Sequence, residues 1–152
     1  MLTNALRLIS VIVCATALIW AANPVVGTWT LNLAKSRFSP GPAPQQETRV
    51  YEAQGEGIKV TVRTVAADGH STTVLISANY DGKDYPVTGS SVYDAIALKR
   101  ISDQIAEASL LHAGNVVATA RREISDDGRT MTITYKASNG PINNKAVYDK
   151  QE

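Results

Sequence analysis

Hydrophobic and polar residues alternate along most of the chain beyond its first two dozen residues. The segment 58–63 reads Ile-Lys-Val-Thr-Val-Arg, and the segment 130–135 reads Thr-Met-Thr-Ile-Thr-Tyr. A period of two places successive side chains on opposite faces of a β-strand. The alternation therefore predicts strands that each have one buried face and one solvated face.

Turn signals separate these segments at regular intervals. Each pairs glycine with Asp, Asn or Glu, the composition that tight hairpin turns favour: Gly55-Glu56-Gly57, Asp68-Gly69, Asp81-Gly82, Gly114-Asn115, Asp127-Gly128 and Asn139-Gly140. Together the two patterns predict ten strands, near residues 25–32, 47–53, 57–66, 71–80, 83–88, 93–101, 104–112, 116–124, 130–136 and 143–150.

The segment 102–113 is compatible with two structures. Ser102 could cap a helix that runs through the Ala/Leu-rich stretch and ends before Gly114. Hairpin signals on both sides favour a strand instead. We expect the strand, and a helix here would remove one strand from the sheet.

Ten antiparallel strands in about 130 residues must close or stack, because one open sheet would expose apolar surface and unpaired edges. We expect an all-β fold, a single antiparallel up-and-down β-barrel of about 8–10 strands, with a two-sheet sandwich as the alternative. The connection 32–44 carries three prolines in five residues and should be extended rather than helical. Its Phe38 should either close one end of the core or gate a ligand.

The N-terminal residues 1–22 are typical of a secretory signal peptide. Arg7 is their sole charge, and an apolar run and small residues follow it. The apolar run is shorter than the ~20 residues that span a bilayer, which argues against the alternative of a membrane anchor. We expect cleavage somewhere in 17–22, one domain over 23–152, and an exported protein in the periplasm or outside the cell without stable membrane insertion.

Composition excludes several classes of function. The full chain has 15 basic and 14 acidic residues, and loss of Arg7 with the leader would balance them, so no nucleic-acid partner is expected. The single cysteine, Cys14, lies in the leader. His70 and His112 lie beside turns, and no nucleophile, paired-carboxylate or phosphate-loop motif stands out. We therefore expect no enzyme, no metal and no cofactor, and the sequence names no protein partner.

Two terminal motifs resemble those of a known superfamily. The first predicted strand contains Gly27-Thr28-Trp29, and the chain closes with Val147-Tyr148-Asp149-Lys150. This combination is similar to the calycins, which comprise the lipocalins and the fatty-acid-binding proteins. The segments 27–44 and 125–132 also resemble a group of small exported bacterial lipocalin-like proteins of unassigned function. The resemblance implies a barrel around an internal ligand cavity, with Trp29 sealing one end.

The chain departs from these families at two points. Fatty-acid-binding proteins carry an arginine two residues before the closing tyrosine, and the pair holds the lipid carboxylate; here that position is Ala146. Only Tyr148 matches, so the carboxylate clamp does not carry over whole. Lipocalins stack a basic side chain on the tryptophan, for which Arg121, Arg122 and Lys150 are all candidates.

Two functions remain open from the sequence. In the first, the barrel binds a small apolar or amphipathic molecule, and a cavity of roughly 300 Å³ or more would support it. In the second, the interior is filled, and the protein serves a structural or interaction role in the cell envelope. The candidate cavity-lining residues are mostly aromatic side chains on predicted inward faces: Trp29, Tyr80, Tyr135, Tyr148 and Phe38.

Overall fold

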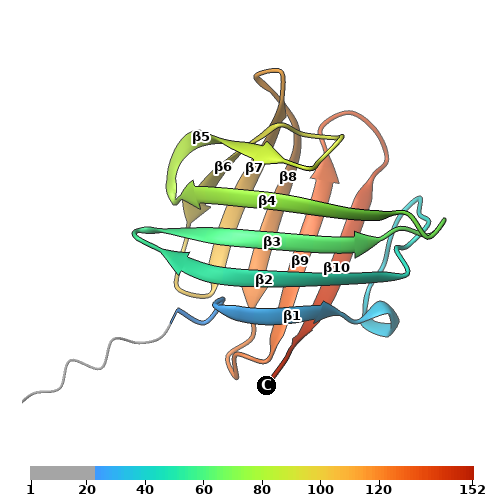
Figure 1. Ribbon diagram of the computed structural model, residues 1–152, viewed down its shortest axis with the longest axis horizontal. Coiled ribbons are helices and arrows are strands. Elements are labelled where there is room, and N and C mark those ends of the chain that lie inside the picture. The colour runs from blue at the N-terminus through green and yellow to red at the C-terminus, as the bar shows by residue number, and fades with distance from the viewer. Residues whose placement is uncertain (1–22) are drawn as a thin grey trace, which may run out of the picture.

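The computed structural model describes residues 23–152, which form one closed antiparallel barrel (Figure 1). The predicted signal peptide lies outside the described residues. The ten strands are β1 (Gly27–Leu31), β2 (Gln46–Gln54), β3 (Gly57–Val65), β4 (Ser71–Asn79), β5 (Asp81–Thr88), β6 (Ala95–Arg100), β7 (Ile105–His112), β8 (Asn115–Ile124), β9 (Thr130–Ala137) and β10 (Asn143–Lys150).

The all-β prediction and the up-and-down barrel are confirmed. Each strand pairs with its neighbours in sequence, and β1 closes the ring by pairing with β10. The segment 102–113 is mostly strand β7, so the helical alternative is wrong. The turn between β4 and β5 centres on Tyr80 rather than on Asp81-Gly82, which lie within β5.

The short strand β1 is bonded along both edges. Trp29 lies opposite Arg49 of β2 and opposite Lys150 of β10. Residues directly opposite each other in an antiparallel pair point to the same face. All three side chains therefore point to the inner face of the sheet. The register of β1 thus brings its aromatic ring beside one cation from each neighbouring strand.

The connection between β1 and β2 is extended apart from one short turn. A 3₁₀ turn, η1 (Leu33–Lys35), begins at Asn32, whose side chain accepts a hydrogen bond from the Lys35 backbone. Arg37 then forms an isolated bridge with Lys145 of β10. The proline-rich part that follows adds no helix, as its composition predicted.

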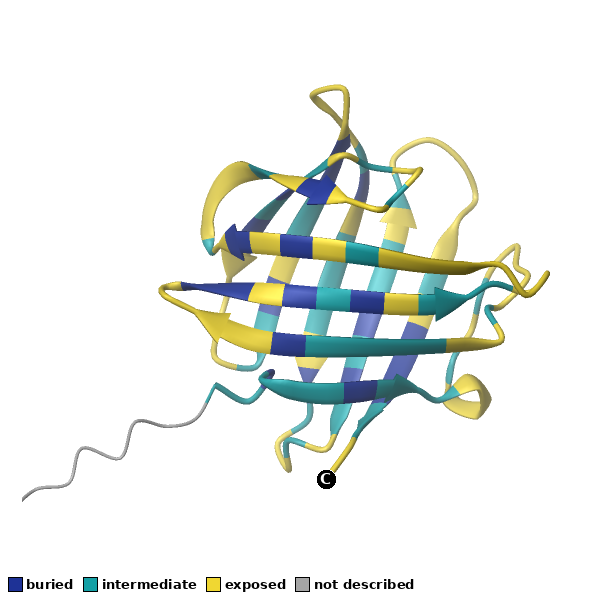
Figure 2. Cartoon of the chain, in the orientation of Figure 1, coloured by how far each residue is buried: buried dark blue, intermediate teal, exposed yellow. Residues whose placement is uncertain are grey.

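Inward and outward positions alternate along the strands, and the buried positions line the inside of the barrel (Figure 2). The hydrophobic core combines β-branched and leucine side chains with Trp29, Tyr51, Met131 and Tyr148. Among residues 23–152, no polar or charged residue is fully buried. Burial of this apolar inner face provides the main driving force for folding.

The ring of Trp29 is completely buried and seals the end of the barrel at which β1 begins. Its Nε1 donates a hydrogen bond of 2.8 Å to the carbonyl oxygen of Val25. The Lys150 ammonium lies 5.2 Å from the ring centroid and donates to the carbonyl oxygen of Pro24. Lys150 is therefore the basic partner of the tryptophan.

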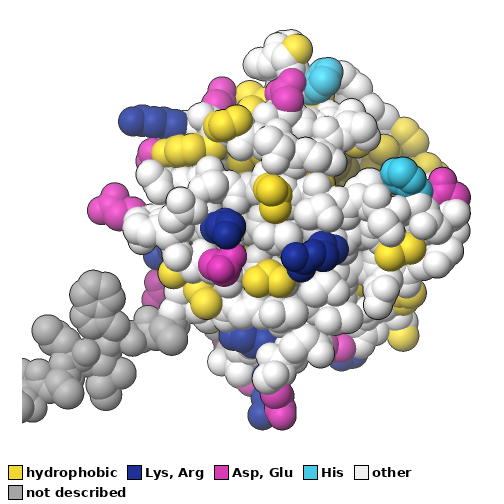
Figure 3. Space-filling view, in the orientation of Figure 1, with side chains coloured by type: hydrophobic (Ala, Val, Ile, Leu, Met, Phe, Trp, Pro, Cys, Tyr) yellow, Lys and Arg dark blue, Asp and Glu magenta, His cyan; other side chains and the backbone are white. Residues whose placement is uncertain are grey.

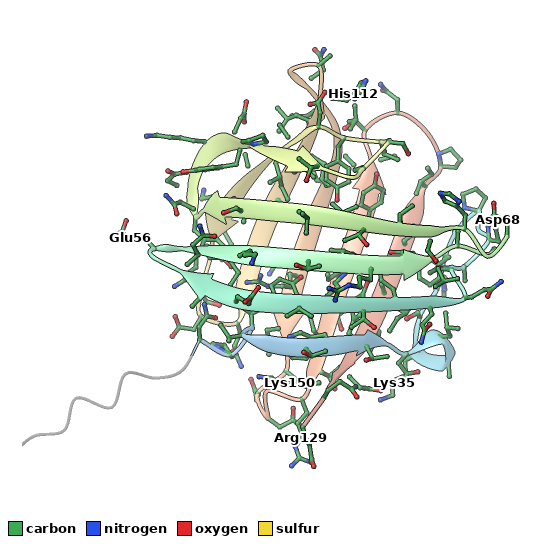
Figure 4. The ribbon with its side chains drawn as sticks, in the orientation of Figure 1. Lys35, Glu56, Asp68, His112, Arg129 and Lys150 are labelled. Carbon is green, nitrogen blue, oxygen red and sulfur yellow. The ribbon has the colours of Figure 1, made fainter. Side chains whose placement is uncertain are left out.

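Lys150 reaches Trp29 by crossing over Gly27. The backbone of Gly27 has a φ of +137°, and a Cβ atom there would lie 2.8 Å from Cε of Lys150. Glycine thus meets two requirements at this position, an unusual backbone angle and a close approach. Figure 4 shows Lys150 at the edge of the barrel near Arg129, whose carbonyl oxygen accepts from the Lys150 backbone.

The outer face is solvated and mixed in character. Over the strands nearest the viewer, Figure 3 shows hydrophobic side chains scattered among basic and acidic ones, and the exposed pair Lys59–Glu52 bridges β3 and β2 at 3.3 Å. Isolated exposed apolar side chains are normal on a soluble surface. Within residues 23–152, no helix is long and apolar enough to cross a membrane.

Replacing the buried tryptophan tests its role in the core. Trp29→Ala should lower the free energy of unfolding by about 3–5 kcal/mol, because it removes a large packed ring and leaves a cavity. Urea unfolding would measure the change, with the exposed Val92→Ala as the control expected to alter stability little. A Trp29→Ala midpoint close to that of the wild type would contradict the assignment.

Candidate functional site

The barrel encloses a cavity of about 270 Å³. Its volume falls just below the roughly 300 Å³ at which small-molecule pockets usually begin. The interior is therefore neither packed solid nor as open as in a barrel for large ligands. Its lining is mainly apolar and aromatic, with Glu47, Arg49, Arg122 and Asn144 as polar members.

Small side chains leave this space open. Ala106 and Ala108 of β7, Ala120 of β8 and Ala146 of β10 all line the cavity. Ala108 and Ala120 lie directly opposite each other, so two adjacent strands present only methyl groups at this level. A larger aliphatic side chain at these positions would fill part of the cavity.

A buried cluster of polar groups forms one wall of the cavity. Glu47 and Arg49 both lie on the inward face of β2, and Tyr148 reaches them from β10. The Tyr148 hydroxyl donates to Glu47 Oε1 at 2.6 Å, and Arg49 Nε donates to the same oxygen at 2.7 Å. Thr64 Oγ1 donates to the second Glu47 oxygen at 3.0 Å. Both oxygens of this carboxylate are thus satisfied by the protein.

Each member of the cluster titrates abnormally. Burial alone would raise the pKa of Glu47, but the charge of Arg49 and the hydrogen bonds of Tyr148, Arg49 and Thr64 hold this pKa below its ordinary value. Burial raises the pKa of Tyr148 well above the ordinary tyrosine value. Nearby Glu47 and the tyrosines outweigh burial for Arg49 and raise its pKa. At neutral pH the cluster is an ion pair with a neutral phenol.

Arg122 of β8 faces the same cavity without a carboxylate partner. Its Nη1 and Nη2 each donate to the Tyr80 hydroxyl at 3.3 Å, and its guanidinium lies 5.5 Å from the ring centroid of Tyr51. Within residues 23–152 it forms no salt bridge, and its Nε is the one buried side-chain nitrogen or oxygen without a hydrogen-bond partner. The guanidinium of Arg122 is therefore only partly satisfied by protein groups.

Three further aromatic side chains line the cavity. Phe38 comes from the proline-rich connection, Tyr93 from the turn between β5 and β6, and Tyr135 from β9. Burial raises the pKa of both Tyr93 and Tyr135, so each is a neutral phenol at physiological pH. A phenol offers a ligand an apolar ring together with one hydrogen-bonding group.

The structure brings together three of the five predicted site residues, since Phe38, Tyr135 and Tyr148 line the cavity. Trp29 is not among the lining residues and instead seals the barrel end. Tyr80 also lies outside the lining, where Arg100 stacks on its ring at 4.5 Å and its hydroxyl accepts from Arg122.

Sequence reasoning missed Glu47 and Arg49 as interior groups and left Arg122 unplaced. The hairpin register contained the signal: with the predicted turn at 55–57, Arg49 lies opposite Val62 and Glu47 opposite Thr64. Val62 belongs to the predicted inward face, so its partner Arg49 must point inward too. Arg122 lies between Ala120 and Ile124, which are two positions away on either side and share its face of β8. Because these two residues are small or apolar, they indicated that Arg122 also points inward.

No protein-family model matches the chain, and no curated protein matches it either. A solved structure does, that of the Schistosoma mansoni fatty acid binding protein in complex with arachidonic acid. The match covers 85% of this chain and 97% of the other, with a TM-score of 0.59 and 14% sequence identity. This chain has a calycin fold. The expectation drawn from Gly27-Thr28-Trp29 and the closing strand is thereby confirmed at the level of fold.

The calycin barrel in this chain carries its arginine on a different strand. Ala146 occupies the position expected for an arginine, and Arg49 from β2 approaches Tyr148 instead, with 3.1 Å between Arg49 Nε and the hydroxyl oxygen.

The two histidines lie apart from the cavity. His70 and His112 are exposed beside turns, and within residues 23–152 no three metal-binding side chains gather in one place.

The depressed pKa of Glu47 makes part of the stability pH-dependent. Ionised Glu47 stabilises the fold above its unperturbed pKa of 4.5, and this contribution disappears as the pH falls through the lower pKa of the folded state. Between about pH 7 and about pH 3, the free energy of unfolding should therefore fall less for Glu47→Gln than for the wild type. Urea unfolding at both pH values would measure the difference. The exposed Glu52→Gln should behave like the wild type, and an equal loss in Glu47→Gln would refute the effect.

Proposed function

We propose that this protein is an exported, non-enzymatic binding protein that holds one small apolar or amphipathic molecule inside its barrel. The observation that carries the proposal is a cavity of about 270 Å³, lined by apolar and aromatic side chains and by Arg122, a half-buried cation without a carboxylate partner. Convergence of a few polar groups in an apolar pocket is the usual character of a small-molecule site.

The volume limits the size of the ligand. Since one water occupies about 30 Å³ in the liquid, a cavity of about 270 Å³ holds about nine groups of that size. This corresponds to a compact molecule such as a single substituted ring or a short aliphatic chain. The aromatic side chains Phe38, Tyr93 and Tyr135 suit a ring or a chain equally well.

The charge of the lining favours an acidic polar end. Arg49 is neutralised by Glu47, whereas Arg122 has only a phenol oxygen and aromatic rings as partners. A buried charge without a counter-ion is costly, and an anionic ligand would remove that cost. The ligand is thus a small molecule whose acid group bonds to Arg122 and whose apolar part occupies the remaining space.

The calycin fold supports the same conclusion, because the Schistosoma mansoni neighbour was solved with arachidonic acid bound. Export is supported by the layout of residues 1–22 and by a cysteine-free sequence over residues 23–152. Mass spectrometry of the protein recovered from its natural compartment would test export. Loss of the N-terminal leader would support export, and a chain that retains these residues would refute it.

Filling the cavity tests the binding function. Ala120→Phe places a ring inside the cavity, whereas Ala97→Phe makes the same change on the outward face of β6. We expect wild type and Ala97→Phe to bind benzoate at one equivalent per chain, and Ala120→Phe to bind it at least about tenfold more weakly. Isothermal titration would measure the affinities, and native mass spectrometry of the undelipidated protein would detect a co-purified ligand.

The alternative function is a filled barrel that acts through its outer surface, and it predicts a different outcome of the same experiments. Cooperatively folded wild type that binds neither benzoate nor benzyl alcohol, and that carries no co-purified mass, would overturn the binding function. Equal affinity of Ala120→Phe and wild type would place any binding outside the cavity and would also count against it.

A further inference from the structure

The hydrogen bonds of Glu47 have the form of a bound acid. One carboxylate oxygen accepts from both the Tyr148 hydroxyl and Arg49 Nε, and the other accepts from Thr64. A tyrosine and an arginine that converge on one carboxylate oxygen would hold the carboxylate of a ligand equally well. In this chain the carboxylate comes from the protein itself.

We propose that Glu47 is a specificity-determining residue, an internal counter-ion that occupies the Arg49–Tyr148 pair and so prevents that pair from binding the acid group of a ligand. The role presupposes the ligand-binding cavity described above. It directs an acid ligand to Arg122 alone, and it limits the cavity to molecules with a single acidic group.

Three observations on described residues support this role. The side chain of Glu47 is only 12% exposed and that of Arg49 only 23%, so solvent screens the pair little. All three partners of Glu47 lie on other strands or two residues away, so its position is fixed by the sheet register rather than by a flexible loop. Both residues also line the cavity, so a ligand acid could reach the pair if Glu47 were absent.

The alternative is that Glu47 only neutralises a buried arginine for stability. The two roles differ in what happens when the carboxylate is removed but the arginine stays. If Glu47 occupies an anion site, then Glu47→Ala, which removes the carboxylate and the space it fills, converts the Arg49–Tyr148 pair into a vacant anion site. If it has no such role, the variant is merely less stable.

The test uses formate as the smallest carboxylate and formamide as its uncharged counterpart. In the Arg122→Met background, which removes the one unneutralised arginine among the lining residues, adding Glu47→Ala should produce a saturable, formate-dependent rise in melting temperature. Arg122→Met alone should show a response at least about tenfold weaker in apparent affinity. Formamide, and chloride at the same ionic strength, should have little effect.

A second variant controls for the arginine. In the same Arg122→Met background, adding Arg49→Gln to Glu47→Ala removes the partner charge. It should abolish the formate response and restore stability, because no charge is then left uncompensated at this pair. If the Glu47→Ala protein does not fold in formate-free buffer, formate should restore its cooperative melt, and this result would equally support the role of Glu47.

The outcomes separate this role from the proposed function. Identical formate responses with and without Glu47→Ala, or a response that survives Arg49→Gln, would overturn the role of Glu47 even where the wild type binds benzoate. Failure of the wild type to bind benzoate would overturn the proposed function, while the formate response would still show whether Glu47 blocks an anion site.

Discussion

Closure of the barrel through β1 is the constraint on which both the core and the cavity depend. This five-residue strand bonds to β2 and β10, and its register sets Trp29 opposite Arg49 and Lys150. A slip of one residue in β1 would turn Trp29 to the opposite face, away from both cations. The sealed end of the barrel and the lysine over the indole therefore both depend on the backbone hydrogen bonds of β1.

The cavity results from a contrast in side-chain size between two parts of the barrel. Around Trp29 and Met131 the interior is filled, and both side chains have no exposed surface. Around Ala108 and Ala120 the facing strands contribute only methyl groups. Protein interiors normally pack as densely as organic crystals, so a space of this size costs stability unless water or a ligand occupies it. The hydrogen-bonding groups along its wall can bind either occupant.

Period-two patterns and glycine turns were sufficient to predict the ten strands and the barrel, because both are local properties of the chain. Tyr135 and Tyr148 were predictable as inward-facing residues for the same reason, whereas Phe38 reaches the cavity from the proline-rich connection, where no alternation applies. Glu47 and Arg49 were not recognised, because a charged pair on a strand is usually solvent-exposed, and only the register of the hairpin shows that it points inward. Tyr80 directly follows β4, packs against the core and bonds to Arg122, although it does not itself line the cavity.

The two cavity arginines differ in how their charge is compensated, and that difference decides the character of the site. Taking a guanidinium out of water is costly, and a carboxylate held by several hydrogen bonds offsets the cost far better than a phenol or a ring face does. Arg49 has such a carboxylate in Glu47, whereas Arg122 has Tyr80 and Tyr51 and one buried N–H with no partner. Protein groups thus neutralise one arginine of the cavity, Arg49, and leave the other, Arg122, without a counter-ion. Under the proposed function, the ligand binds where the chain leaves a charge uncompensated, and in this barrel that position is Arg122.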